Sequence, residues 1–180
     1  HLSVVQPKVD HGLQRNLGTA LELDWVRTIR VNRSAVERRA NTLTKRRSIK
    51  KEWQAAWLLR AVTLIDLTTL SGDDTPGKVE RLCAKAVKPV TNQILNKLGF
   101  IDRQITVGAV CVYHSMLPAA LQSLSGTGIP VAAVSAGFPT GLASLDTRIR
   151  EVEISATNGA SEIDVVINRA HLLTGDWQAL

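Results

Sequence analysis

The segment Leu64–Leu70 (LIDLTTL) indicates the fold class, because apolar and β-branched side chains alternate in it with polar ones. Three later stretches have a similar composition: Thr106–Tyr113 (TVGAVCVY), Pro130–Gly137 (PVAAVSAG) and Glu162–Asn168 (EIDVVIN). Short, largely apolar runs of this kind are typical of strands that are covered on both sides in a parallel sheet. We therefore predict four strands at these positions.

Longer segments with helical spacing separate the strands. Thr75 followed by proline marks a helix start, so a helix is predicted over Pro76–Val87. The other helices are predicted over Ser115–Leu124, over Ala143–Thr157 and, beginning after Gly175, within Leu172–Leu180. Strands that alternate with helices along the chain indicate βα units around a parallel sheet.

The length of these units favours a barrel. Each βα unit has about 29 residues, close to the share of one unit in a (β/α)8 barrel of roughly 250 residues. We predict an α/β chain of the TIM-barrel type that holds about half a barrel. The chain starts at His1 and stops inside an unfinished helix, which we interpret as an extension followed by a truncated barrel. An open doubly wound sheet is the alternative, although Ser71–Asp74 lacks its glycine-rich phosphate fingerprint.

The segment before the barrel is basic. Between Arg27 and Arg60 there are eleven Lys and Arg side chains and two acids, so this segment carries +9 in a chain of net charge +6. A capping box at Ser34–Glu37 predicts a helix from Ser34 to Arg47, and a second helix is predicted over Lys50–Ala61. We expect three regions, which are a poorly ordered lead-in over 1–20, a helical extension over 21–62 and the half-barrel over 63–180.

A basic block can contact nucleic acid. Trp53 and Trp57 lie four residues apart on one helical face, which favours packing over base stacking. We expect no nucleic-acid contact, while a non-catalytic fragment with a basic, nucleic-acid-binding N-terminal region is the alternative function.

Composition excludes several other classes. The apolar runs are far shorter than the ~20 residues that cross a bilayer, so we expect no membrane contact. Two cysteines and no apolar leader indicate a reducing, cytoplasmic environment. The four histidines have no metal-ligand spacing, and no nucleotide-binding loop occurs, so we expect neither a metal nor a cofactor. Nothing in the sequence specifies an oligomeric state.

Alternation places two carboxylates on one face of the sheet. In a barrel, one face of each strand meets the helices and the other faces the interior. Asp164 and Val166 are predicted to point inward from the fourth strand, as are Asp66 and Thr68 from the first. An inward carboxylate is costly unless it is paired, hydrogen-bonded or functional. Two acids from non-adjacent strands would share one interior.

The second strand adds a thiol to this face. Cys111 is predicted to lie on the same face as Val107, Ala109 and Tyr113. Buried cysteines behave as small apolar residues, so we interpret Cys111 as a lining residue rather than a nucleophile. Phe138–Gly141, directly after the third strand, is interpreted as an ordinary turn.

Several long motifs resemble those of the deoxyribose-phosphate aldolases, in particular the animal enzymes. They are Lys51–Leu59, Ile65–Thr75, Ala109–Tyr113, Ala136–Pro139 and Glu162–Arg169, in the family's order. The resemblance implies a class I aldolase on a (β/α)8 barrel without a metal or organic cofactor. Such an enzyme reversibly cleaves 2-deoxy-D-ribose 5-phosphate to D-glyceraldehyde 3-phosphate and acetaldehyde through a lysine Schiff base.

The resemblance also implies residue roles. Asp164 corresponds to the family's proton-transfer acid/base and Asp66 to a member of the same polar network, so both are candidate catalytic residues. Thr68 and Cys111 are candidate substrate-binding residues. No lysine follows Lys97, so the family's catalytic lysines would lie beyond this chain, which we expect to be inactive alone.

Two further points bear on this interpretation. His114 stands where the family typically has proline, so the loop after the second strand is expected to differ. Another possibility is a non-catalytic product whose open edge strands, 64–70 and 162–168, pair with another chain.

Overall fold

The computed structural model describes residues 20, 22–46, 48–100 and 103–180. The chain divides into two compact units, His1–Val31 and Asn32–Leu180. The first unit contains the short helix α1 (Leu23–Thr28), and the predicted lead-in lies outside the described residues except for Ala20. In the described part of the chain, no helix is both long enough and apolar enough to cross a membrane.

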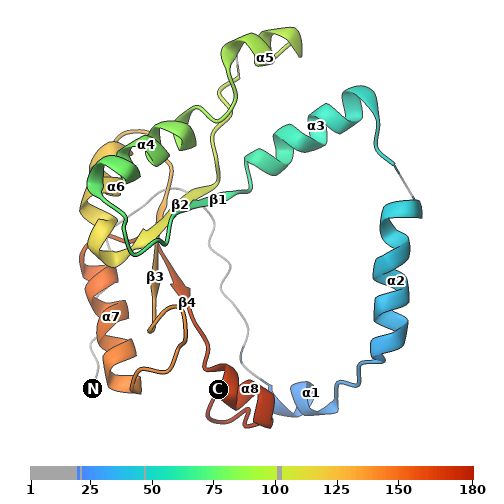
Figure 1. Ribbon diagram of the computed structural model, residues 1–180, viewed down its shortest axis with the longest axis vertical. Helices are drawn as coiled ribbons and strands as arrows, with labels where there is room; N and C mark the ends of the chain where they lie inside the picture. Colours follow the sequence, from blue (N-terminus) through green and yellow to red (C-terminus); the bar gives the residue numbers. More distant parts are fainter. Residues whose placement is uncertain (1–19, 21, 47, 101–102) are drawn as a thin grey trace. The chain divides into compact units, whose positions relative to one another are not determined.

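One four-stranded parallel sheet organises the second unit, in the order β1-β2-β3-β4 (Figure 1). Its strands are β1 (Asp66–Thr68), β2 (Ala109–Tyr113), β3 (Val131–Ser135) and β4 (Glu162–Val165). Each strand lies inside a stretch that was expected to form one. Sequential parallel pairing is the topology of half a TIM barrel, so the predicted fold class is confirmed.

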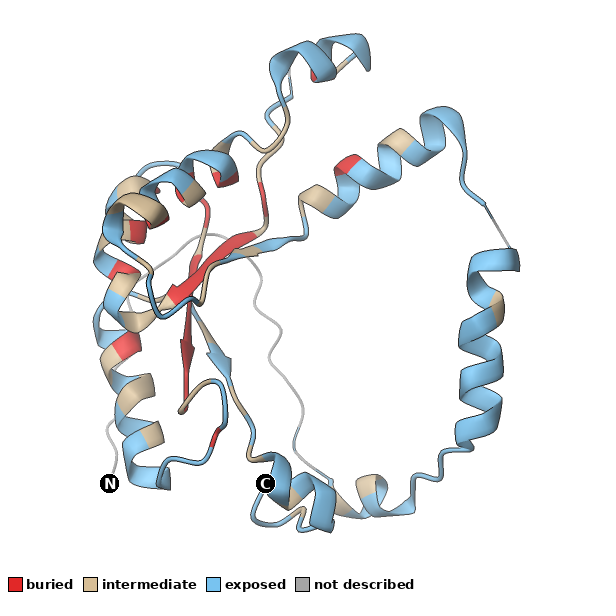
Figure 2. Ribbon diagram, viewed as in Figure 1, coloured by how far each residue is buried: buried red, intermediate tan, exposed pale blue. Residues whose placement is uncertain are grey.

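Three helices cover one face of the sheet: α4 (Pro76–Val87), α6 (Leu117–Ser123) and α7 (Leu145–Thr157). On α4 the buried residues are Val79, Cys83 and Ala86, whose spacing places them on one helical face. They belong to the main apolar core together with β2 and β3 side chains such as Val110. Both central strands are buried, whereas the edge strands β1 and β4 are largely exposed (Figure 2).

The helix starts at α4 and α7 follow from local capping. The Thr75 hydroxyl accepts a hydrogen bond from the Lys78 amide at 3.4 Å, and Ser144 does the same for Thr147 at 3.4 Å. The predicted bounds of α4 are confirmed. Helix α7 begins two residues later than expected, because Ser144 occupies its N-cap position.

Two predicted helix boundaries are wrong. Helix α2 (Arg33–Arg46) is capped by Asn32, whose Oδ1 accepts from the Ala35 amide at 3.0 Å, so the expected Ser34–Glu37 capping box does not form. Helix α8 (Arg169–Thr174) ends at Gly175 instead of following it. Gly175 has φ 72°, a left-handed conformation that terminates helices.

Helix α3 (Lys51–Val62) does not bury its tryptophans within the chain. Trp53 is 69% exposed and Trp57 is 60% exposed, and Leu59 is the buried residue of this helix. The expectation that this face packs is therefore wrong for the chain as it stands. Helix α5 (Asn92–Lys97) and the 3-10 turn η1 (His114–Met116) were not predicted as separate elements.

The prediction that Val107 lies on the Cys111 face is wrong. Val107 belongs to the helix-covered core, on the other side of the sheet. The amides of Gly108 and Ala109 both donate to the Ile65 carbonyl, at 3.0 and 3.3 Å. Two successive residues opposite one partner form a bulge, which reverses the alternation before the strand. Glycine is favoured there, since a Cβ on residue 108 would lie 3.1 Å from the Thr63 carbonyl oxygen, a contact tight enough to require a small shift of the backbone.

Candidate active site

The candidate site lies on the sheet face that α4, α6 and α7 leave open, which we call the inner face. Its buried residues are Cys111, Ala132 and Val134. Partly buried apolar side chains surround them: Leu70, Tyr113, Phe138 and Val166. The alternation predicted for the first and fourth strands is confirmed, because Leu70 and Val166 pack here while Leu67 and Ile163 pack on the helix side.

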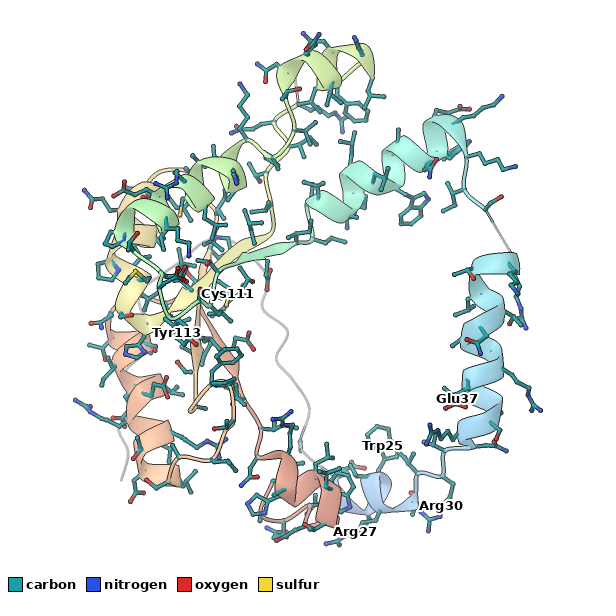
Figure 3. The ribbon with its side chains drawn as sticks, viewed as in Figure 1. Trp25, Arg27, Arg30, Glu37, Cys111 and Tyr113 are labelled. Carbon is teal, nitrogen blue, oxygen red and sulfur yellow. The ribbon has the colours of Figure 1, made fainter. Side chains whose placement is uncertain are left out.

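Strand register determines how the candidate residues are spaced. Thr68 of β1 is directly opposite Cys111 of β2. Asp164 of β4 is opposite Val134 of β3, one step further along the sheet. The Cys111 Sγ and an Asp164 carboxylate oxygen are 4.0 Å apart, a contact that reaches across β3. Figure 3 locates Cys111 and Tyr113 on β2.

The electrostatics of Cys111 link all four predicted site residues. Burial, followed by the negative charges of Asp164 and Asp66, raises the pKa of the Cys111 thiol to about 11. The Thr68 hydroxyl acts in the opposite direction, lowering this pKa by hydrogen bonding. The thiol is therefore neutral at physiological pH, and Asp66, Thr68 and Asp164 lie around a single buried sulfur.

The two carboxylates remain accessible. Asp66, Thr68 and Asp164 are exposed, whereas Cys111 is buried. None of the four strands contains a lysine or an arginine. Within the described part of the chain, neither Asp66 nor Asp164 forms a salt bridge. The inner face thus presents negative charge with no cation of its own to neutralise it.

The loop after β1 is held by a polar network. Asp74, whose side chain is 3% exposed, accepts hydrogen bonds from the Thr69 hydroxyl at 2.9 Å and from the Ser71 amide at 3.0 Å. Lys78 of α4 lies 3.2 Å from it. Burial acts to raise the pKa of Asp74, but these three partners outweigh it and lower that pKa. The buried carboxylate of Asp74 therefore anchors the loop.

Helix α7 fixes the loop after β3. The Glu151 carboxylate accepts from the Gly137 amide at 2.8 Å, and Arg148 donates to the carbonyls of Ala136 at 3.2 Å and Val166 at 2.8 Å. This loop places Phe138 on the inner face, edge-on to Tyr113 with the ring centroids 5.9 Å apart. Phe138 is therefore part of the candidate site. The predicted turn over Phe138–Gly141 is confirmed, because the amides of Thr140 and Gly141 donate to the Gly137 carbonyl at 3.2 and 2.9 Å.

His114 begins η1, at the position where proline was expected from the resemblance. Its Nδ1 lies 3.7 Å from a Glu151 carboxylate oxygen and has no hydrogen-bond partner among the residues that the structure describes. Arg148 and Glu151 could not be predicted as part of the site from the sequence, since their contacts join residues that are 12 to 18 positions apart. Across the described ranges, no cluster of His, Cys, Asp and Glu has the arrangement of a metal site.

No family model matches the chain. The chain is 53% identical to human deoxyribose-phosphate aldolase over 167 residues, which are 92% of this chain and 52% of the human protein. The mouse deoxyribose-phosphate aldolase is also 53% identical, over 91% of this chain and 52% of its own length.

Solved structures agree on the fold. A Coccidioides immitis protein of the deoxyribose-phosphate aldolase type is 31% identical, with a TM-score of 0.52 over 64% of this chain and 39% of its own. The aldolase QR15 is 21% identical and supports the fold alone, with a TM-score of 0.50 over 66% of this chain and 45% of its own. Over nearly its whole length the chain is therefore similar to the deoxyribose-phosphate aldolases, and it spans about half the length of the curated relatives that it matches.

Proposed function

We propose that this chain supplies the β1–β4 half of a deoxyribose-phosphate aldolase active site. The reaction is the reversible cleavage of 2-deoxy-D-ribose 5-phosphate to D-glyceraldehyde 3-phosphate and acetaldehyde. One observation carries the proposal: Asp66 and Asp164, from opposite edges of the sheet, both act on the Cys111 thiol of the open inner face. Identity of 53% to animal enzymes of this name supports the choice of substrate.

The chemistry needs an amine that the four strands lack. A lysine from outside this chain condenses with the aldehyde carbon of the open-chain sugar, releasing water and forming an iminium. A base then takes the proton of the hydroxyl on carbon 3, and the bond between carbons 2 and 3 breaks. Carbons 3 to 5 leave as D-glyceraldehyde 3-phosphate, and the electrons of the broken bond move to the iminium to form an enamine. Protonation and hydrolysis of the resulting enamine release acetaldehyde and regenerate the amine.

In this proposal Asp164 moves these protons, and Asp66 belongs to the same polar network. A carboxylate beside a cationic amine stays ionised and can act as a base. Thr68 and Cys111 line the substrate pocket. The high pKa of Cys111 keeps its sulfur a neutral thiol near pH 7, which suits a lining residue and not a nucleophile.

We also propose a cytoplasmic location and small sugar-phosphate and aldehyde substrates. Two free, buried cysteines support the location, because reducing compartments preserve thiols. The substrates follow from the proposed reaction.

Borohydride trapping tests the function. The test protein joins this chain to the part of human deoxyribose-phosphate aldolase that the match does not reach. With substrate and borohydride, we expect covalent labelling of this chimera and none of the 180-residue chain. Labelling of the chain alone would show that the nucleophile is one of its own lysines.

The role of Asp164 is tested in the same chimera. We expect Asp164→Asn to lower kcat by about 10²–10⁴-fold, the scale of a lost general acid/base, without changing the circular dichroism spectrum. Asp176→Asn is the matched control, because Asp176 is half exposed and follows α8. Turnover by Asp164→Asn close to that of the unsubstituted chimera would exclude the assigned role.

A further inference from the structure

Glu151 of α7 contacts the loops that follow two neighbouring strands. One carboxylate oxygen, Oε2, accepts a hydrogen bond from the Gly137 amide at 2.8 Å, in the loop after β3. The other, Oε1, lies 3.7 Å from Nδ1 of His114, in the turn after β2. The chain neighbours of these two residues are Phe138 and Tyr113, whose rings meet edge-on at the inner face. A single carboxylate therefore joins both loops that carry aromatic side chains to the candidate site.

The loop after β3 has a backbone conformation that needs such a contact. Ala136 has φ 65° and Gly137 has φ 77°, and both angles lie in the left-handed region that residues with a side chain rarely adopt. A backbone of this kind persists where surrounding contacts hold it. Here the Glu151 carboxylate holds the Gly137 amide, and the Arg148 guanidinium holds the Ala136 carbonyl. Any group that moves the Glu151 carboxylate therefore acts on this loop.

His114 is such a group. Its Nδ1 atom is buried without a hydrogen-bond partner in the described part of the chain, although the side chain as a whole is 41% exposed. The 3.7 Å to the Glu151 oxygen is longer than a hydrogen bond, and a buried nitrogen without a partner is costly. The Glu151 side chain is only 21% exposed, so salt and water screen its charge less than that of a surface group. A positive charge on the imidazole therefore draws the two groups together.

The other charged groups near His114 come from α7. The turn that begins at His114 packs against α6, α7 and β3, and neither α6 nor β3 contains a titratable residue. On α7, Asp146, Arg150 and Glu151 line a pocket of about 560 Å³ together with His114. Asp146 attracts a charged imidazole and Arg150 repels it, but Arg150 is paired with Glu153 at 3.0 Å. Among the described residues, Glu151 is the one acid within ion-pair distance of His114.

We propose that His114 is a positioning residue for the candidate site, whose charged imidazole closes on the Glu151 carboxylate. This contact, which we call the brace, fixes the Gly137 amide and with it the Phe138 edge of the inner face. The proposal rests on the proposed function, in which the substrate binds at this face, and adds a dependence on pH. Histidine gains its charge as the pH falls from about 8 to about 5. The brace is therefore closed at the lower pH and open at the higher one.

Hydrogen exchange of the Gly137 amide tests the brace. NMR protection factors, which remove the intrinsic effect of pH on exchange, are measured in the 180-residue chain at pH 6 and pH 8. We expect about threefold more protection at pH 6, the scale of a partly exposed ion pair. His114→Gln should remove this difference, whereas His114→Lys, which stays charged, should keep the protection at both pH values. His171→Gln is the matched control and should leave the difference intact, since His171 of α8 lies 3.8 Å from the Asp176 carboxylate and is 37% exposed.

A second variant makes the test independent of changes in the turn itself. Glu151→Gln keeps an oxygen that accepts from the Gly137 amide but has no charge to attract the imidazole. The protection of Gly137 in this variant should therefore be the same at pH 6 and pH 8, with circular dichroism confirming its fold.

The effect on the site is measured in the chimera. The KM for 2-deoxy-D-ribose 5-phosphate in His114→Gln is divided by that of the unsubstituted chimera at each pH, so that ionisation of the substrate cancels. We expect a ratio of about three at pH 6 and about one at pH 8, with kcat changed less than about twofold. A contact that positions the substrate equally in the ground and transition states acts on KM and not on kcat.

The outcomes separate this proposal from the proposed function. Equal protection of Gly137 at pH 6 and pH 8 in the unsubstituted chain, or a difference that His114→Gln or Glu151→Gln leaves intact, would overturn the brace. A difference that both variants abolish would support the brace even where borohydride fails to label the chimera, a result that counts against the aldolase chemistry alone. An active, labelled chimera with a KM ratio near one at both pH values would support the chemistry and overturn the positioning role.

Discussion

The pKa of the Cys111 thiol depends on the charges of the two candidate catalytic acids, even with no substrate bound. Burial, then the charges of Asp164 and Asp66, raises the pKa of its thiol from 9.0 to about 11. Because folding favours the protonated thiol, its contribution to stability is complete below about pH 9 and is lost as the pH rises through 11. Alkylation requires the thiolate, and two pKa units correspond to ~100-fold less of it near pH 8. We expect iodoacetamide to label Cys111 about 100-fold more slowly in the folded chain than in urea.

Removing one of the charges should accelerate this labelling. Asp164→Asn takes away the larger of the two charge effects on the thiol, so the pKa of Cys111 falls and its folded-state labelling at pH 9 becomes faster. Asp176→Asn controls for the loss of a carboxylate elsewhere. Peptide-resolved mass spectrometry distinguishes Cys111 from Cys83. Equal labelling rates in the two variants would contradict the electrostatic contact between Asp164 and the sulfur.

Helix α7 is expected to hold the carboxyl ends of strands β3 and β4 together. Arg148 donates to one backbone carbonyl after each strand, Ala136 after β3 and Val166 after β4. Hydrogen bonds from a charged donor are worth about 1.5–3 kcal/mol each at partly buried positions. Arg148→Met keeps the apolar stem and should lower the free energy of unfolding in urea by about 2 kcal/mol.

The control for this change is on the same helix. Arg150 is 70% exposed and pairs with Glu153 within one helical turn, so Arg150→Met should change stability by less than about 0.5 kcal/mol. Hydrogen exchange at the Val166 amide, which bonds the Ser135 carbonyl, should accelerate in Arg148→Met and not in Arg150→Met. The same unfolding free energy in both variants would show that the Arg148 contacts are dispensable.

Elements with local signals could be predicted from the sequence, and those that depend on distant contacts could not. Thr75 and Ser144 each specify a helix start within three residues. Asn32 and Ser34 are both good caps two residues apart, and the choice of Asn32 depends on geometry that a motif does not contain. The bulge at Gly108 depends on its register against Ile65, on another strand, so the face of Val107 could not be predicted.

In the candidate site, too, local features could be predicted from the sequence and long-range contacts could not. Period-two alternation was sufficient to place Asp66 and Asp164 on one face, because it is a property of each strand alone. The 4.0 Å contact between Cys111 and Asp164 joins residues 53 positions apart and depends on the order of the strands. Phe138 reaches the same face through a loop whose anchors lie on α7, which no periodic pattern indicates.

At the scale of the whole chain, charge is segregated. The segment from Arg27 to Arg60 carries +9 and the remainder of the chain is net negative. Helix α2 buries no residue, so its charges are on exposed side chains. The charged residues of the four strands are all acids. Exposed positive charge alone supports weak contacts with any polyanion, whereas the acids of the inner face require a specific cation.

This distribution agrees with the expectation of no specific nucleic-acid contact and limits any binding to the weak, non-specific kind. Helix α2 contains no aromatic residue, so its cations have no platform on which bases could stack, and Trp53 and Trp57 belong to α3. By fluorescence anisotropy with a single-stranded oligonucleotide at physiological salt, we expect a Kd no tighter than about 10⁻⁶ M, the non-specific range. Replacing both tryptophans by alanine should leave the Kd unchanged. Submicromolar binding that this double variant abolishes would instead show that the exposed tryptophans of α3 stack on bases, and the basic extension would then be a nucleic-acid interface.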